Sequence, residues 1–314
     1  MPAASTHFRI LRAAHLGMCF GVRDAIHLAL NQTAPVTILG DLVHNETVLN
    51  QLRSQGVKIE RQVADVATPN VMISAHGASE RAMEQIRGRG LNVLEATCPL
   101  VHYAHRVVAR LVEDGFHPVI IGKRDHVEVR GVTEDLNDYD VVLTEEDVAN
   151  LKERPRFGIA AQTTQPIDRV RHLVALIEQK FPRSEVRFSD TVCQPTKQRQ
   201  TAAIELAQQS DVVIVIGGAH SNNTRELVQT CSRHCAQVYH VQTAEDLRPD
   251  WFAEAKAVGI TAGTSTPECT IEAVEAWLRD FLEFQDRLAR HVNGAHATDR
   301  RQEHNTETTE LKPR

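Results

Sequence analysis

Three cysteines and a series of polar loop residues recur at similar intervals along this 314-residue chain. Cys19, Cys98 and Cys193 stand 79 and 95 residues apart, and each is followed by two polar loops. The first loop follows its cysteine after 25, 28 and 28 residues. Side chains that recur at such regular intervals can meet at one site if three similar structural units surround that site. The loops contribute His44, His76, His126, Glu128, Thr163, Thr164, Ser221, Asn223 and Ser265.

The three widely spaced cysteines suit a cofactor that needs protein ligands on three corners. A 4Fe-4S cluster held by three cysteines leaves one iron open for substrate or water, as catalysis requires. No C-x2-C pair supports a zinc ribbon. A cysteine at a helix N-terminus also has its thiolate stabilised by the helix dipole. Spacing alone leaves a second interpretation open, in which the three cysteines are buried structural thiols.

The polar loops could form an anion-binding pocket, because imidazole, hydroxyl and amide groups all donate hydrogen bonds. The chain has neither a P-loop motif nor a G-x-G-x-x-G motif, so a standard nucleotide site is not indicated. Glu128 is the one carboxylate that the spacing places in these loops, and in a desolvated cavity it could donate a proton. Each of these residues could instead serve turn formation or core packing.

The remaining cysteines do not join the series. Cys231 and Cys235 stand four residues apart on a predicted helix, where they could supply two metal ligands or pack in the core. Cys269 is predicted to be structural. With six cysteines in a long chain and no export signal, a disulfide framework is not expected.

Apolar segments with strand character precede the polar loops in two alternating kinds. Segments ending in glycine and a polar loop cover residues 36–45, 119–128 and 212–223, and segments ending in small polar turns cover residues 71–79, 157–165 and 257–266. A helix is expected after each cysteine. After Cys98, apolar residues from Leu100 to Val112 recur with helical spacing, and Pro99 suits the first turn.

Strands that alternate with helices predict mostly parallel sheets, in which ligands bind beyond the carboxyl ends of the strands. Three such α/β units could surround a pseudo-threefold axis, with all three cysteines and their loops facing one central cavity. Repetition is also common in any protein built from βαβ units, so coincidence is an alternative explanation of the pattern.

Composition narrows the classes of protein. The net charge is −6, with lysine and arginine scattered, which argues against a nucleic-acid partner. No apolar run approaches the ~20 residues of a membrane span, and the N-terminal region lacks the apolar core of a secretory signal. We therefore expect a cytoplasmic protein with no membrane contact.

Nine motifs contain the cysteines and loop residues: HLGMCFGVRDAI, GDLVHN, SAHG, EATCPLV, HVEVRG, AAQTT, DTVCQPTKQRQ, GGAHSNNTREL and TAGTSTP. They occur in the same order in the LytB/IspH family of 4-hydroxy-3-methylbut-2-enyl diphosphate reductases, which this chain resembles over about residues 8–285. The resemblance implies a trefoil-like arrangement of three similar α/β domains, with mostly parallel sheets, around a central iron–sulfur cavity. The domains are expected at residues 8–98, 99–192 and 193–287, followed by a disordered tail at 288–314.

The resemblance also implies an activity. Members of the family reductively dehydroxylate (E)-4-hydroxy-3-methylbut-2-enyl diphosphate to isopentenyl and dimethylallyl diphosphate, the last step of the methylerythritol phosphate route to isoprenoids. They use an oxygen-sensitive 4Fe-4S cluster, and reduced ferredoxin or flavodoxin is the expected electron donor. Carried onto this chain, the cluster ligands are Cys19, Cys98 and Cys193, and Glu128 is the catalytic acid. The substrate-binding residues are His44, His76, His126, Thr163, Ser221, Asn222, Asn223 and Ser265.

Four positions depart from the commonest family pattern: Phe20, Tyr103, Val127 and Asn222. None removes a proposed ligand or the acid. Tyr103 stands where lysine is frequent and alters the local charge, which bears on substrate affinity and donor docking more than on reaction type.

Two other classes of function compete with the reductase. A hydro-lyase whose open cluster iron acts only as a Lewis acid would need no electron donor, so dependence on reductant separates it from the reductase. A non-enzymatic iron–sulfur sensor or zinc-stabilised binding protein would not need histidines, Glu128 and Ser265 to converge on an open iron.

Overall fold

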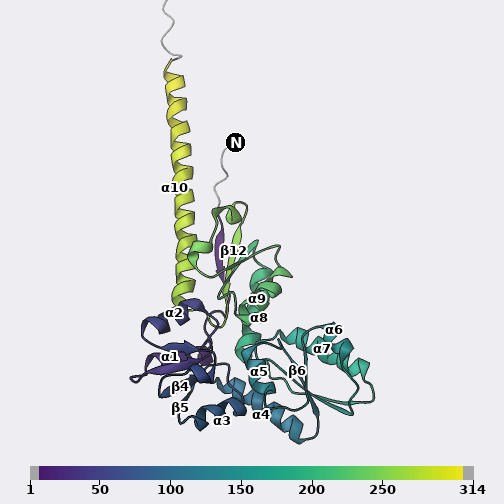
Figure 1. Ribbon diagram of the computed structural model, residues 1–314. Helices are drawn as coiled ribbons and strands as arrows, with labels where there is room; N and C mark the ends of the chain where they lie inside the picture. Colours follow the sequence, from purple (N-terminus) through teal and green to yellow (C-terminus); the bar gives the residue numbers. More distant parts are fainter. Residues whose placement is uncertain (1–6, 307–314) are drawn as a thin grey trace, which may run out of the picture.

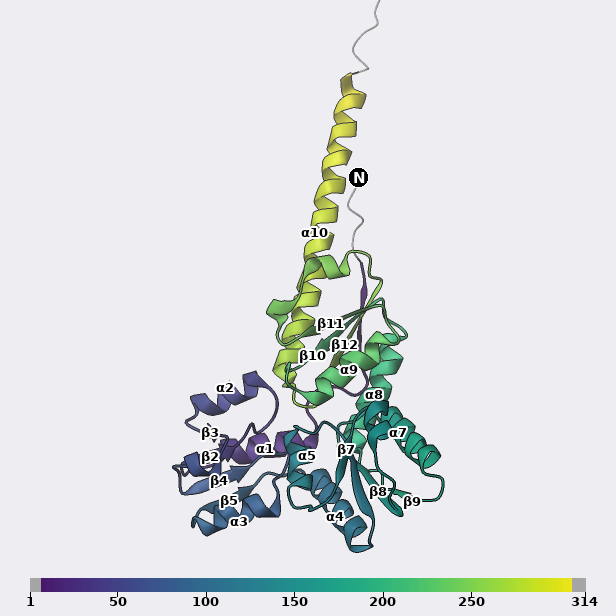
Figure 2. The same cartoon turned by 45° about the vertical axis from the view of Figure 1, so that its right-hand side comes forward.

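The computed structural model describes residues 7–306, which form three four-stranded sheets with helices packed against them (Figure 1). Every strand pairing in this part of the chain is parallel. Figure 2 shows the sheets in three separate lobes that meet near the first turns of α1, α5 and α8. The predicted α/β class with three similar units is confirmed.

The first unit has the strand order β3-β2-β4-β5. Its strands are β2 (Val36–Leu39), β3 (Lys58–Glu60), β4 (Asn70–Ile73) and β5 (Asn92–Glu95). Its helices are α1 (Phe20–Leu30), α2 (Glu46–Ser54) and α3 (Glu80–Gly88), with a 3-10 turn η1 at Val63–Asp65. The buried faces of α1 and α2 pack on β2 and β4 in one apolar cluster.

The second unit repeats this order as β7-β6-β8-β9. Its strands are β6 (His117–Ile121), β7 (Asp140–Val142), β8 (Arg156–Ala161) and β9 (Glu185–Phe188). Its helices are α4 (Pro99–Glu113), α5 (Val127–Thr133), α6 (Glu145–Asn150) and α7 (Ile167–Lys180). The helix expected after Cys98 is confirmed as α4, with Pro99 in its first turn.

The third unit has the order β11-β10-β12-β1. Its strands are β10 (Val212–Ile216), β11 (Gln237–Val241), β12 (Ala257–Ala262) and β1 (Arg9–Arg12). Its helices are α8 (Gln194–Ala207), α9 (Asn222–Ser232) and α10 (Glu268–Thr306), with 3-10 turns η2 (Ala244–Asp246) and η3 (Pro249–Phe252).

The domain division expected from the sequence is wrong at its first strand. β1 lies within the range 8–98 but pairs with β12 in the third sheet, where Ile10 lies opposite Val258. Its place in that sheet matches those of β5 and β9 in the other two: each is the edge strand that precedes a cysteine. The N-terminal strand β1 therefore completes the third repeat. Its pairing with β12 is a long-range contact, which the four residues of β1 cannot specify by themselves.

The disordered tail expected at 288–314 is also contradicted over most of its length. Residues 288–306 continue α10, which extends away from the third unit (Figure 1). Scarce apolar residues indicate that a segment has little to bury, but they do not prevent a helix. Residues 268–306 contain no proline and only one glycine, which allows one continuous helix. Residues 307–314 of the expected tail lie outside the described part of the chain.

In the described range 7–306, no helix combines the length and apolar content that crossing a bilayer needs.

The assignment of β1 to the third unit can be tested with Phe8, which is 5% exposed and lies against Phe252 and Phe281 at ring-centroid distances of 5.5 and 6.3 Å. Phe8→Ala is expected to lower the free energy of unfolding by about 3–5 kcal/mol, as for other buried aromatic truncations. Both tryptophans of the chain pack in this cluster, so their fluorescence in urea reports on this unit.

The matched control is Phe284→Ala on α10, where the side chain is 53% exposed. That variant should unfold within about 0.5 kcal/mol of the wild type. Equal effects of the two substitutions would contradict the packing of the N-terminal strand in the third unit.

Candidate active site

Each cysteine of the repeat is the N-cap residue of a helix: Cys19 of α1, Cys98 of α4 and Cys193 of α8. The backbone N–H of each cysteine donates to a backbone carbonyl that lies just after the end of the neighbouring strand. This bond extends by one step the hydrogen-bonded pairing between that strand and the edge strand before the cysteine. The bonds run from Cys19 to Thr264 (3.2 Å), from Cys98 to Ala75 (3.1 Å) and from Cys193 to Thr163 (3.0 Å). The sheets therefore fix all three cysteines in the same way.

The three thiols lie close enough to influence one another. All are partly buried, and burial raises the pKa of Cys98 and raises that of Cys193 to about 11, with the charges of Cys19 and Glu128 adding to both effects. A Cβ atom on Gly21, in the first turn of α1, would lie 2.5 Å from the sulfur of Cys98. The thiols of Cys98 and Cys193 therefore stay protonated near pH 7 unless a cationic group such as iron lies against them. This donor set fits a metal cofactor.

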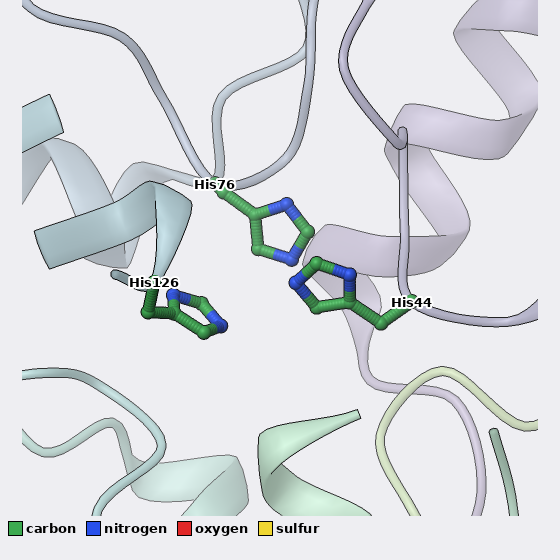
Figure 3. A group of neighbouring side chains, drawn as sticks. All are labelled: His44, His76 and His126. Carbon is green, nitrogen blue, oxygen red and sulfur yellow. The ribbon is translucent and has the colours of Figure 1, made fainter. Parts of the chain in front are cut away.

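Three histidines from two units form a second group of functional side chains (Figure 3). His44 follows β2, His76 follows β4, and His126 caps α5. The ring centroids of His44 and His76 are 4.4 Å apart, and His126 lies 5.2 and 5.6 Å from them. One nitrogen from each ring lies within 4.8 Å of the others. By distance alone, this group could hold a metal ion or an anion.

The hydrogen bonding of His126 favours an anion over a metal ion as the ligand of the three histidines. The backbone N–H of Glu128 donates to Nδ1 of His126 (3.2 Å), so in the neutral ring Nε2 carries the proton. Burial, with the charges of His44, Lys123 and Arg225, lowers the pKa of His126 to about 3. Burial also holds the pKa of His76 well below its usual value. His126 is thus a neutral N–H donor near pH 7 and offers no free lone pair to a metal.

The third unit adds hydroxyl and amide donors at the N-terminus of α9. Ser221 accepts from the N–H of Thr224 (3.3 Å), which leaves its hydroxyl proton free. Asn223 accepts from the N–H of Thr264 through Oδ1 (2.9 Å), so the orientation of its amide is fixed. Its Nδ2 is buried and has no hydrogen-bond partner among the described residues. Both groups can donate to an anion.

Residues of the third unit contact the backbone carbonyl of His44 and so bring that unit next to the three histidines. Ser265 donates to the carbonyl of His44 (3.3 Å), and a Cβ atom on Gly218 would overlap that same carbonyl oxygen. Asn222 is turned towards the second unit, where its Nδ2 donates to Thr164 (3.3 Å). The loops of all three units therefore meet at one place, as the threefold spacing predicted.

A cleft of about 940 Å³ leads to this group and is lined by His44 and His126. Its walls carry both cationic and acidic side chains. The cations are Arg53, Arg61, Lys123, Arg130 and Arg225, and the acids are Asp41, Glu46, Asp125 and Glu134. A small anionic molecule can therefore reach the histidines from solvent without crossing the protein core.

Glu128 is a buried acid beside these donors. It is 3% exposed, and its Oε1 accepts from the backbone N–H of Thr163 (2.7 Å). Burial raises the pKa of Glu128 to about 7, although the Thr163 hydrogen bonds and the charge of His44 act in the opposite direction. A carboxyl group with this pKa is partly protonated at neutral pH, so it can donate a proton.

The other cysteines lie elsewhere. Cys231 and Cys235 are buried in the apolar core of the third unit, where the Cys231 sulfur donates to the Ala203 carbonyl (3.8 Å) and the Cys235 sulfur to that of Asp211 (3.3 Å). Burial raises the pKa of Cys231 to about 12. Cys269 is exposed on α10. These positions favour packing over metal binding for the Cys231–Cys235 pair.

Sequence reasoning missed two residues that shape the site. Thr264 takes part through its backbone, which the sequence does not reveal. Arg199 is 7% exposed and lies on α8 beside the buried Ala202 and Ala203. The sequence did offer one signal for Arg199: it stands next to the apolar positions of a predicted helix, which indicates burial. A buried cation needs specific partners, so such an arginine is a candidate site residue.

The pKa of Glu128 predicts how stability depends on pH. A carboxyl whose pKa is raised in the folded state keeps a proton that the unfolded chain has released, so the free energy of unfolding falls as pH rises from about 4.5 to about 7. The loss amounts to about 3 kcal/mol. Glu128→Gln should remove this part of the slope in urea unfolding followed by circular dichroism.

Glu153→Gln is the control, because Glu153 is exposed. It should keep the wild-type slope. A Glu128→Gln variant with the wild-type slope would show that Glu128 titrates as an ordinary carboxylate.

Comparison with known proteins places this geometry in a family. Residues 10–279 match the sequence profile described as LytB protein. A 4-hydroxy-3-methylbut-2-enyl diphosphate reductase from Aquifex aeolicus is 36% identical over 284 residues, which cover 88% of this chain and 98% of the relative. The reductase of the same name from Dehalococcoides mccartyi strain 195 is 36% identical over 274 residues, covering 85% and 96%.

Two solved structures share the fold. The E-1-hydroxy-2-methyl-but-2-enyl-4-diphosphate reductase of Plasmodium falciparum aligns with a TM-score of 0.80 and 27% identity, covering 87% of each chain. A structure of (E)-4-hydroxy-3-methyl-but-2-enyl diphosphate reductase, described as the terminal enzyme of the non-mevalonate pathway, aligns at 0.63 and 36%, covering 86% of this chain and 99% of the other. Because the profile match and the relatives span nearly the whole three-unit fold, this chain belongs to the LytB protein family.

Proposed function

We propose that this protein is a 4-hydroxy-3-methylbut-2-enyl diphosphate reductase. It removes the hydroxyl group of (E)-4-hydroxy-3-methylbut-2-enyl diphosphate with two electrons and two protons and forms isopentenyl and dimethylallyl diphosphate. This is the last step of the methylerythritol phosphate pathway. The names of the relatives support the reaction, and the family is one of iron–sulfur enzymes.

The observation that carries the proposal is a chain of hydrogen bonds that links a cysteine, Glu128 and a histidine. The N–H of Cys193 donates to the carbonyl of Thr163 (3.0 Å), the N–H of Thr163 donates to Oε1 of Glu128 (2.7 Å), and the N–H of Glu128 donates to Nδ1 of His126 (3.2 Å). Three metal-ligating thiols, a protonatable acid and the histidine group therefore adjoin one another. A reductive dehydroxylation needs these elements together: a source of electrons, a proton for the departing oxygen and a holder for the diphosphate.

The cofactor is a 4Fe-4S cluster with Cys19, Cys98 and Cys193 as its ligands. Such a cluster supplies electrons and one open iron that polarises the hydroxyl group of the substrate. The three cysteines come from different helix N-termini, so each can hold one corner, and each helix places its positive end towards the anionic cluster. A reduced ferredoxin or flavodoxin is the proposed electron donor.

The diphosphate is held by neutral donors. The Nε2–H of His126, the hydroxyl group of Ser221 and the free amide of Asn223 donate to the anion, together with His44 and His76, while Ser265 donates to the carbonyl of His44 and holds that histidine in place. Thr163 and Asn222 complete the lining. Buried N–H and O–H donors bind phosphate oxygens strongly because water does not compete for them. Binding of the charged end then fixes the position of the hydroxyl end.

Glu128 protonates the departing oxygen. Its pKa of about 7 keeps a proton available at neutral pH, and the Thr163 N–H orients the carboxyl group. When the proton leaves, the same N–H stabilises the carboxylate that forms.

The direct test is anaerobic turnover of (E)-4-hydroxy-3-methylbut-2-enyl diphosphate by reconstituted protein, with oxidation of reduced viologen followed by absorbance. Viologen oxidation that depends on substrate, with both isoprenoid diphosphates as products, is the expected result. Hydration or dehydration of substrate without reductant would indicate the hydro-lyase instead. An intact cluster without any reaction would contradict both enzymes.

The ligand assignment predicts which cysteines the cluster needs. Replacing Cys19, Cys98 or Cys193 by serine should remove most of the iron and sulfide bound after reconstitution. Cys231→Ser is the matched control, because this thiol is buried in the core of the third unit and should leave cluster content unchanged. Loss of the cluster only in Cys231→Ser would overturn the assignment.

The substitution Glu128→Gln tests the proposed role of Glu128 as the catalytic acid. The amide keeps the size of the side chain but cannot release a proton, so turnover should fall by about 10²–10⁴-fold, a typical contribution of a general acid. Iron content and the KM for substrate should change little. Near-normal turnover in this variant would remove Glu128 from the acid role.

A further inference from the structure

Arg199 is a buried cation beside the cysteine ligands. It lies on α8, six residues after Cys193, and is 7% exposed. Within residues 7–306, its guanidinium donates three hydrogen bonds, all to backbone carbonyl oxygens rather than to carboxylates. A buried positive charge without an acidic partner is costly, so its position requires another source of stabilisation.

The hydrogen bonds of Arg199 connect two of the cysteine loops. Nε and Nη2 both donate to the carbonyl of Gly17 (2.9 and 2.7 Å), two residues before Cys19. Nη1 donates to the carbonyl of Pro195 (3.0 Å), two residues after Cys193. The planar guanidinium therefore ties the loop before α1 to the first turn of α8, which a single flexible donor could not do as rigidly.

The anionic groups that act on Arg199 are themselves cysteines. Burial lowers the pKa of Arg199, and the negative charges of Cys19 and Cys193 oppose this effect. Arg23 is a further cation near it, but Arg23 is exposed. An arginine keeps its charge throughout the pH range in which proteins fold. An anionic group held by Cys19 and Cys193 would supply a counter-charge for Arg199.

We propose that Arg199 is a positioning residue that also raises the reduction potential of the cluster held by Cys19, Cys98 and Cys193. This inference rests on the proposed iron–sulfur function. One-electron reduction of the cluster by an external low-potential donor adds one negative charge and forms or breaks no covalent bond. A fixed cation in a poorly solvated site stabilises the reduced state more than the oxidised state. Arg199 thereby makes the cluster easier to reduce.

A redox titration of the reconstituted protein, followed by electron paramagnetic resonance without substrate, tests the proposal. Arg199→Gln should shift the midpoint to more negative potential. We expect the ratio of reduced to oxidised cluster at a fixed potential to fall about tenfold, which is about 59 mV for a one-electron couple. Arg199→Lys keeps the charge and should stay within about threefold of the wild-type ratio, even if it loses the paired bonds to Gly17.

The matched control is Arg23→Gln, which removes an arginine from α1 at an exposed position. Solvent screens that charge, so its midpoint should stay close to the wild-type value. An unchanged midpoint in Arg199→Gln at full cluster content would overturn the proposal. A shift of equal size in Arg199→Lys and Arg199→Gln would also overturn it, because positioning alone would then explain the effect.

A second measurement covers the case in which Arg199→Gln assembles no cluster. A buried lysine, unlike an arginine, loses its proton in the alkaline range. The midpoint of Arg199→Lys should then fall below that of the wild type as pH rises, with both proteins measured at each pH. Equal pH profiles for the two proteins would contradict a charge effect.

Turnover is not a readout of this experiment, so its failure differs from failure of the proposed function. A protein that carries the cluster but does not reduce the diphosphate would refute the reductase and leave the inference about Arg199 intact. A wild-type protein that assembles no cluster would refute both.

Discussion

One hydrogen bond, repeated three times, organises the molecule: the backbone N–H of a cysteine donates to a carbonyl just past the end of the neighbouring strand. The bond extends a parallel ladder by one step beyond an edge strand and turns the chain into a helix. Each sheet therefore needs an edge strand that leads into a cysteine. In the third sheet that edge strand is β1, which pairs with β12 and leads into Cys19.

This constraint also sets the chemistry of the cavity. The polar loops follow the carboxyl ends of β2, β4, β6, β8, β10 and β12, and most of them lead into helix N-termini. Those ends present N–H groups and a positive potential, to which Lys123 in the loop after β6 adds. Neutral donors such as His126 and Asn223 add to this field with little charge of their own. Such a pocket is suited to hold a diphosphate and an anionic iron–sulfur cluster near each other. A group of lysines would also bind the diphosphate, but their positive charges would favour loss of the proton from Glu128.

The sequence predicted the parts of the structure that repeat. The spacing of the cysteines and loops was sufficient to predict three parallel α/β units and to gather their loops, because residues at equivalent places in similar units occupy equivalent positions in space. It could not predict the partner of β1, which depends on a strand some 250 residues away. It was wrong about residues 288–306 because apolar content reports on burial and not on local helix formation. Arg199 and Thr264 lie within the quoted motifs, but their roles depend on bonds to or from the backbone, which the residue types alone do not indicate.

Thr163 connects the proposed proton donor to one of the proposed cluster ligands. Its N–H donates to Glu128 (2.7 Å), and its carbonyl accepts from the N–H of Cys193 (3.0 Å). One residue just after β8 thus bonds both to the side chain of Glu128 and to the backbone of Cys193, a proposed cluster ligand. A displacement of the Thr163 backbone would therefore affect both bonds. The end of β8 therefore sets where the proposed proton donor and the proposed cluster ligand Cys193 lie relative to each other.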